Sequence, residues 1–159
     1  MPFGRLVQAV DEWAETNQPE CEIFGQVLSP RQNPYVPRNF EITARLSPKD
    51  YTAVFRKAQL IISHAGMGTI LTALTQAKCI CVMPRQRKFG EHRNDHQIAT
   101  VNHLREHPGL FKARDENDLP EQINAALRAS EGGQTAAIDP FSDTGFTDKL
   151  RSFIMTGRT

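Results

Sequence analysis

The chain has 159 residues, of which 39% are hydrophobic and 23% are charged, and its formal net charge is +1. This length is typical of one compact domain, so residues 1–159 are expected to form a single unit. The balanced charge excludes a general attraction for nucleic acid or an anionic membrane. No stretch approaches the ~20 apolar residues of a membrane span, and the first residues lack a secretory pattern.

The first third of the chain predicts one helix and two strands before a second helix. Apolar residues at helical spacing predict an amphipathic helix over residues 3–13. An apolar strand is expected at 21–28, and after a proline-rich turn region the alternation of residues 40–46 predicts another. A serine N-cap followed by proline then predicts a helix over 47–58.

Residues 60–64, LIISH, form a continuous apolar run that predicts a central strand covered on both faces. The following expected elements are a helix at 69–77, a strand at 79–84, a polar loop at 85–94, a helix at 95–107, a strand at 110–113, a helix at 118–130, and a loop plus a helix in the extension 131–159. This alternation predicts an α/β fold with one doubly wound parallel sheet. Ligands of such sheets bind beyond the carboxyl ends of the strands.

The segment SHAGMGT, residues 63–69, lies at that edge of the predicted sheet. A helix N-terminus offers unpaired N–H groups and a partial positive charge to phosphate, and Gly66 and Gly68 lack a β-carbon that would obstruct them. Thr69 could add a hydroxyl donor. The alternative is that the glycines only permit a sharp turn while His64 bonds to a neighbouring backbone group. Leu71 stands where a dinucleotide-binding fingerprint has its third glycine.

The next predicted strand end carries the polar segment MPRQRKFGEHRNDHQ. Its side chains could neutralise a diphosphate and bind several hydroxyl groups. They are Arg85, Arg87, Lys88, Glu91, His92, Asn94, Asp95, His96 and Gln97. A solvated polar loop is the alternative, but two neighbouring strand ends of this kind suit a sugar nucleotide.

Other chemistries have weaker signals in this sequence. The three cysteines stand at no zinc spacing and are expected to be reduced packing residues, which suggests a cytosolic setting. Histidines at 92/96 and 103/107 have i,i+4 spacing but no clear third ligand, so no metal is expected. There is no Gly-x-Ser-x-Gly motif and no Walker lysine.

The combination of SHAGMGT with GEHRNDHQ resembles the glycosyltransferase family 28 C-terminal domain. The similarity extends from residue 2 to about residue 127. It is closest to stand-alone subunits of two-part transferases of the Alg13-like and the PssE- or EpsF-like exopolysaccharide kinds. The resemblance implies a Rossmann-like GT-B half that binds a UDP-sugar. With a membrane-anchored partner subunit it would transfer the sugar to a lipid-linked acceptor at the cytoplasmic face of a membrane.

The resemblance also implies which residues bind the donor. The histidine–glycine loop would contact the donor phosphates, and the closing His-Gln pair would contact the sugar hydroxyls. The loop after the second strand would lie beside the nucleobase. The implied donor-binding residues are His64, Ala65, Gly66, Met67, Gly68, Thr69, Thr72, Arg85, Glu91, Asn94, His96 and Gln97, with Arg45 and Leu46 on the nucleobase side.

Two departures from the family pattern stand out. Thr72 occupies the position where many relatives have a glutamate that binds the ribose hydroxyls. The family's first strand, of the form VTVGT, has no counterpart before residue 3. The expectation is a sheet that lacks this strand, either because the protein starts differently or because another chain supplies it.

The resulting hypothesis is an inverting, metal-independent transfer of a hexose or N-acetylhexosamine, with no cofactor besides the UDP-sugar substrate. No catalytic residue is assigned; His64 or His92 could reach an acceptor hydroxyl as general base. The alternative is a non-catalytic, shortened paralogue that acts as a binding or assembly module; a sugar-nucleotide epimerase is disfavoured because such enzymes are longer. The apolar residues of the last segment could dock on the partner subunit, but packing back on the sheet is the favoured alternative; these residues are Phe146, Leu150, Phe153 and Ile154. Homodimers through the interrupted sheet are a further option.

Overall fold

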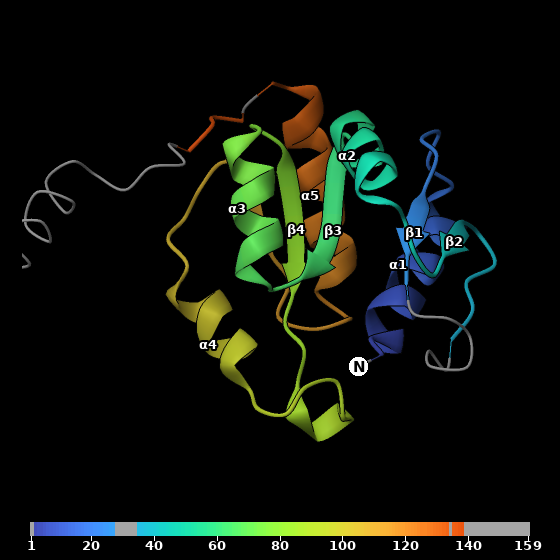
Figure 1. Ribbon diagram of the computed structural model, residues 1–159, viewed down its shortest axis with the longest axis vertical. Helices are drawn as coiled ribbons and strands as arrows, with labels where there is room; N and C mark the ends of the chain where they lie inside the picture. The colour runs from blue at the N-terminus through green and yellow to red at the C-terminus, as the bar shows by residue number, and fades with distance from the viewer. Residues whose placement is uncertain (1, 28–34, 134, 139–159) are drawn as a thin grey trace, which may run out of the picture.

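The computed structural model describes residues 2–27, 35–133 and 135–138 of the chain. Along these residues, helices and strands alternate (Figure 1). The elements are α1 (Gly4–Asn17), β1 (Phe24–Gln26), β2 (Glu41–Thr43), α2 (Pro48–Lys57), β3 (Leu60–His64), α3 (Met67–Thr75), β4 (Cys79–Met83), the 3₁₀ helix η1 (Arg87–Phe89), α4 (His96–His103), β5 (Leu110–Lys112) and α5 (Leu119–Glu131).

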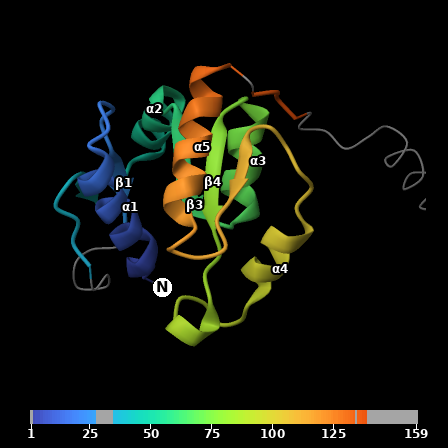
Figure 2. The ribbon, with the colours of Figure 1, turned by 180° about the vertical axis from the view of Figure 1, so that it is seen from behind.

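The five strands form two parallel sheets. One sheet contains β1 and β2, and the other has the order β3-β4-β5. Helices α1 and α5 lie on one side of the strands, as Figure 2 shows from behind, and α2 and α3 lie on the other side. The mixed α/β class with parallel strands between helices is therefore confirmed.

Local sequence explains the start of the second helix. The side chain of Ser47 accepts a hydrogen bond of 3.2 Å from the N–H of Asp50, as an N-cap should. Pro48 occupies the first helical position, where its missing N–H costs nothing. Asp50 in the first turn and basic residues in the last turn both complement the helix dipole.

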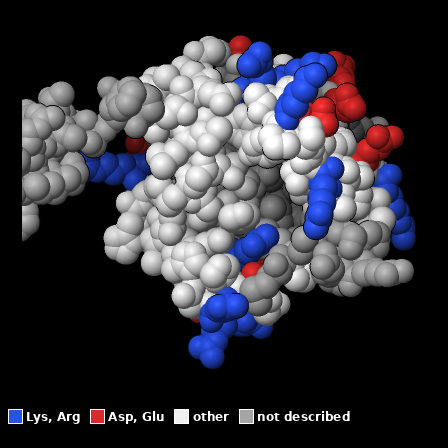
Figure 3. Space-filling view, viewed as in Figure 1, with Lys and Arg blue, Asp and Glu red and all other residues white. Residues whose placement is uncertain are grey.

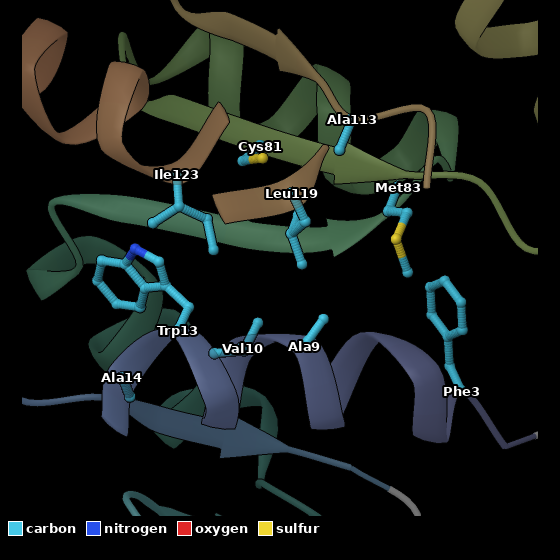
Figure 4. Packing of buried hydrophobic residues seen from close by; sticks show 10 residues of the cluster. All are labelled: Phe3, Ala9, Val10, Trp13, Ala14, Cys81, Met83, Ala113, Leu119 and Ile123. Carbon is cyan, nitrogen blue, oxygen red and sulfur yellow. The ribbon is translucent and has the colours of Figure 1, made fainter. Parts of the chain in front are cut away.

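The core consists of two apolar clusters, one on each side of the larger sheet. In Figure 4, Ala9, Val10 and Trp13 of α1 point toward Leu119 and Ile123 of α5. The second cluster lies on the other side of the sheet, between the sheet and the helices α2, α3 and α4. It contains Phe55, Ala65, Ile70, Ala73, Leu74, Ile80, Val82, Val101 and Leu110. The side chains of β4 contribute to both clusters and are almost completely buried, since β4 has a strand on each edge.

The sheet is interrupted beside β3, which has no neighbour among the described strands on the side away from β4, as expected for a sheet without the family's first strand. Several expectations about the bounds of individual elements were wrong in detail. The strands expected at 21–28 and 40–46 span only three residues each, since each pairs with the other alone. The polar loop contains η1, and α4 ends at His103 because Leu104 has an extended backbone.

The C-terminal expectations lie mostly outside the described residues. These are the helix at 146–155 and its four apolar docking residues. In the part of the chain that the structure describes, no helix has both the length and the apolar character needed to cross a bilayer.

Candidate functional site

The carboxyl end of β3 leads directly into α3, and this junction presents free backbone donors. The N–H of Gly66 donates to the carbonyl of His64 at 2.7 Å. The next backbone N–H that has a partner is that of Ile70, which donates to the carbonyl of Gly66 at 3.2 Å. Gly66 is the N-cap and supplies no side-chain acceptor. Within the described residues, the N–H groups of Met67, Gly68 and Thr69 therefore have no protein partner. Three such donors with the positive helix end form an anion-binding surface.

The two glycines of this loop have different structural roles. A β-carbon on Gly66 would lie 2.9 Å from Nδ1 of His64 and closer still to Cε1, so the imidazole ring packs directly on the backbone of Gly66. A β-carbon on Gly68 would meet nothing within 4 Å. A side chain at Gly66 would therefore have to displace the His64 ring, whereas at Gly68 the fold leaves open space beside the free amides.

A hydrogen-bonded chain connects the ends of β3 and β4. Gln97 is 3% exposed, and its Nε2 lies 3.2 Å from Nδ1 of His64 while its Oε1 accepts from the N–H of Arg85 at 3.0 Å. Because the amide nitrogen of Gln97 is the donor, Nδ1 of His64 is the acceptor in the neutral ring, and Nε2 carries the hydrogen. His64 thus has a donor left for a ligand.

Arg85 supplies positive charge beside this chain of hydrogen bonds. The pKa of His64 is lowered to about 4, first by burial and then by the nearby charges of Arg85 and His92. Two buried nitrogen atoms have no partner among the described residues, Nε of Arg85 and Nδ1 of His92. Burial lowers the pKa of Arg85 from its ordinary value, yet the guanidinium stays charged at any physiological pH. The unsatisfied Nε–H of Arg85 is a charged donor, which favours an anionic ligand.

Glu91, expected at the donor, instead faces the inside of the molecule. It is 4% exposed, and its oxygens accept two bonds from Arg5, at 3.0 and 2.9 Å, and one from the N–H of Gln86 at 2.9 Å. Arg5 also donates to the carbonyl of Pro84 at 3.1 Å and pairs with Glu116 at 2.5 Å. Arg5 was not expected from the sequence, where it is one polar residue of an amphipathic helix.

The remaining expected residues lie around the same edge with fewer contacts. Oγ1 of Thr72 donates to the carbonyl of Gly68 at 2.8 Å and so turns back onto its own helix. Asn94 contacts Nδ1 of His96, whose ring lies edge-on to that of His92. Ala65 is buried, and Thr69 is partly exposed in the first turn of α3.

Arg45 and Leu46 follow β2 and therefore belong to the other sheet. Arg45 is exposed and Leu46 is partly buried. No strand ladder joins β1 or β2 to β3 in the described ranges. Arg45 and Leu46 are therefore connected to the His64–Gly68 loop through the packed core and not through a ladder.

Two surface hollows flank the sheets. One of about 700 Å³ is lined by the end of α1 and by residues at β1 and β2, and one of about 480 Å³ lies between α3 and the end of α4. The first lies away from the junction, whereas the lining of the second includes Met67. In residues 2–27, 35–133 and 135–138, no group of three or more His, Cys, Asp and Glu side chains could hold a metal ion. The candidate site is therefore an open, basic edge, with Lys and Arg side chains gathered over the loop after β4 at the lower end of Figure 3.

The sequence matches a known protein family. The family model described as glycosyltransferase family 28 C-terminal domain matches residues 3–147. No curated protein matches the chain. The matched range includes both sheets and every candidate residue of the site. The chain belongs to the glycosyltransferase family 28 C-terminal domain family.

Proposed function

We propose that this chain is the donor-binding subunit of a two-part glycosyltransferase, which moves a hexose or N-acetylhexosamine from a UDP-sugar to a lipid-linked acceptor. The observation that carries the proposal is the set of free N–H groups on Met67, Gly68 and Thr69, beside a neutral His64. The family is one of glycosyltransferases, and a nucleotide diphosphate is the ligand that such an amide cluster suits best.

In this proposal the diphosphate of the donor lies on the first turn of α3. The amides and Nε2–H of His64 donate to its oxygens, and Arg85 adds a positive charge from the end of β4. These donors are held in place before the ligand arrives, so they stabilise the charge that develops on UDP as it leaves. No metal ion is needed for this step, because helix amides and basic side chains balance the charge.

The sugar would lie toward the start of α4. His96 is exposed there, and Gln97 is fixed by His64 and Arg85. A positioned sugar leaves one face of its anomeric carbon open, so an acceptor hydroxyl would attack from the side opposite UDP and invert the configuration. The general base is assigned to neither subunit.

A second subunit would supply the acceptor. The described edge is open to solvent, and a single open wall does not exclude water or orient an acceptor. A membrane-anchored partner at the cytoplasmic face would close it.

The alternative proposal is a non-catalytic binding or assembly module. Thr72 favours it, because its hydroxyl bonds to the carbonyl of Gly68 rather than facing outward as a ribose ligand. The discontinuous sheet favours it as well.

Calorimetric titration of UDP, UDP-hexoses and UDP-N-acetylhexosamines tests the proposal. We expect UDP to bind and Gly68→Val to weaken it by tenfold or more, because the new side chain would stand over the free amides. Thr75→Ala is the control. It also changes a residue of α3, but one whose hydroxyl bonds to the carbonyl of Leu71 and which lies at the far end of the helix from the free amides. Equal affinity in the chain and in Gly68→Val would refute the amide site. Binding of a UDP-sugar without transfer in the assembled complex would favour the module.

A further inference from the structure

Arg85, which follows β4, is a half-buried cation without an anionic partner. Within the described residues its guanidinium makes no hydrogen bond and no ion pair, and its Nε is buried. Its backbone is nevertheless fixed, because the N–H of Arg85 donates to Oε1 of Gln97 at 3.0 Å. A desolvated charge normally has a partner of opposite sign, since leaving it unpaired costs free energy. The surroundings of Arg85 must therefore keep carboxylates from pairing with it.

The carboxylate of Glu91 lies within electrostatic reach of Arg85 but is already occupied. Burial lowers the pKa of Arg85, and the charge of Glu91 opposes this change. The oxygens of Glu91 instead accept from Nε and Nη2 of Arg5, at 3.0 and 2.9 Å, and from the N–H of Gln86 at 2.9 Å. Arg5 thus holds the carboxylate that Arg85 would otherwise attract.

An aromatic ring takes the place of an anion next to Arg85. Cζ of Arg85 lies 5.4 Å from the centroid of the Phe3 ring, and Cζ of Arg5 lies 5.5 Å from the same centroid. Phe3 is 8% exposed, and in Figure 4 its ring lies next to Met83 at the end of β4. A ring quadrupole attracts a cation without neutralising its charge. Phe3 therefore supports the guanidinium of Arg85 and leaves its charge available.

Arg5 also fixes the chain on both sides of Arg85. Its Nη2 donates to the carbonyl of Pro84 at 3.1 Å, and the Glu91 carboxylate that it holds accepts from the N–H of Gln86. The residues directly before and after Arg85 are thus tied to the first turn of α1. One side chain, Arg5, therefore controls both the backbone position of Arg85 and the freedom of its charge.

The unpaired charge of Arg85 lies at the candidate site. After burial, it is the next cause of the lowered pKa of His64, and Gln97 bonds to both residues. We infer that Arg5 is a positioning residue for donor binding: by holding Glu91 it keeps the guanidinium of Arg85 unpaired, so that this guanidinium pairs with the donor diphosphate. The inference rests on the proposed function, since it requires a diphosphate at the junction of β3 and α3.

Substitution of Arg5 separates this role from a purely structural one. Without Arg5, the carboxylate of Glu91 keeps the N–H of Gln86 and attracts the guanidinium of Arg85. An Arg85 that is paired with Glu91 is lost to the ligand. Removal of the Glu91 charge as well should release Arg85 again, so a second substitution in the same cluster should restore binding.

Calorimetric titration of UDP into the full chain measures these effects, at a temperature where circular dichroism shows each variant to be folded. We expect Arg85→Gln to weaken UDP binding about tenfold, because a charged hydrogen bond is lost. Arg5→Met should weaken it by a similar factor and Arg5→Lys by less than threefold. The double variant Arg5→Met, Glu91→Gln should bind within threefold of the unchanged chain. Asp11→Ala is the matched control, because it removes another buried side chain of α1, one that bonds to Asn39, and should leave the affinity unchanged.

A double-mutant cycle provides the decisive comparison. In the Arg85→Gln background, Arg5→Met should cause no further loss of affinity, because the guanidinium that it protects is gone. A further tenfold loss would overturn the inference, as would a double variant Arg5→Met, Glu91→Gln that binds as weakly as Arg5→Met. If the unchanged chain bound no UDP, the proposed function would fail together with the inference. If UDP bound and Arg85→Gln weakened it while Arg5→Met did not, the inference alone would fail.

Discussion

Arg5 connects three segments that are far apart in the sequence. Its guanidinium donates to Glu91, to Glu116 and to the carbonyl of Pro84, and so joins α1 to the loops after β4 and β5. The side chains of Arg5 and Glu91 are 12% and 5% exposed. The bonds from both glutamates raise the pKa of Arg5 against the effect of burial. Arg5→Met would leave the Glu91 carboxylate buried with only the N–H of Gln86 as partner.

Breaking a buried ion pair from one side costs about 3–5 kcal/mol. Arg5 is not completely buried and water can reach Glu116, so we expect Arg5→Met to lower the free energy of unfolding by about 2–3 kcal/mol. Arg5→Lys keeps the charge but not the two-pronged bond to Glu91, and it should lose about half as much. In the double variant Arg5→Met, Glu91→Gln, the stranded charge is gone and part of the stability should return.

Urea denaturation followed by circular dichroism measures these differences. The control is Arg114→Met, which removes an 84% exposed guanidinium from its i,i+4 pair with Asp118 while Asp118 keeps its bond from the N–H of residue 114; it should lower the midpoint much less than Arg5→Met does. Equal effects of Arg5→Met and Arg114→Met would refute the idea that burial makes the Arg5 cluster important. So would a double variant whose loss equals the sum of the single losses, since the two side chains would then be uncoupled.

Three further predictions concern the loop and the first helix. Gly66→Ala should lower the free energy of unfolding by about 1–3 kcal/mol, because the His64 ring must move. Gly68→Ala should leave it unchanged or raise it by up to about 1 kcal/mol. Urea titration measures both, and a larger loss in Gly68→Ala than in Gly66→Ala would contradict the packing. The pKa of the His64 imidazole is lowered to about 4 in the folded chain. As the pH falls from about 6.5 to about 4, the imidazole is therefore protonated in the unfolded chain but not in the folded one. The melting temperature should fall over this pH range. His64→Gln should lose this part of the pH dependence, and an unchanged profile would refute the assignment. Asp11→Ala removes the acceptor of the Arg38 and Asn39 N–H groups and should cost about 2–3 kcal/mol, while Ala at the exposed neighbour Glu12 should cost little; equal melting temperatures would count against the Asp11 contacts.

The sequence predicts most of the elements because their signals are local. The cap at Ser47 and the glycine loop after β3 each depend on a few adjacent residues, and the structure has both. The position of Glu91 could not be predicted, because its partner Arg5 is 86 residues away and nothing in the spacing of either residue indicates the contact. A carboxylate in a polar loop is as compatible with a ligand as with a buried arginine.

The discontinuity of the sheet has a similar explanation. The apolar run of β3 predicts burial on both faces, and both faces do pack on helices. Periodicity describes the faces of a strand and carries no information about its edges, since backbone donors are the same for every residue except proline. The open edge of β3 was suggested only by comparison with a family pattern, and the backbone pairing is what defines it.

The two halves of the expected donor site therefore rest on different supports. His64, Gly68 and Gln97 are fixed by the β3-β4-β5 sheet and its helices, whereas Arg45 and Leu46 follow β2 in the small sheet. The small sheet is joined to the rest through Ile23 and Phe40, which pack on the core beside α1. Side-chain packing of this kind tolerates small shifts, whereas a ladder of hydrogen bonds fixes the register of every residue. The distance between the two expected halves therefore depends on the packing beside α1 and not on a strand ladder.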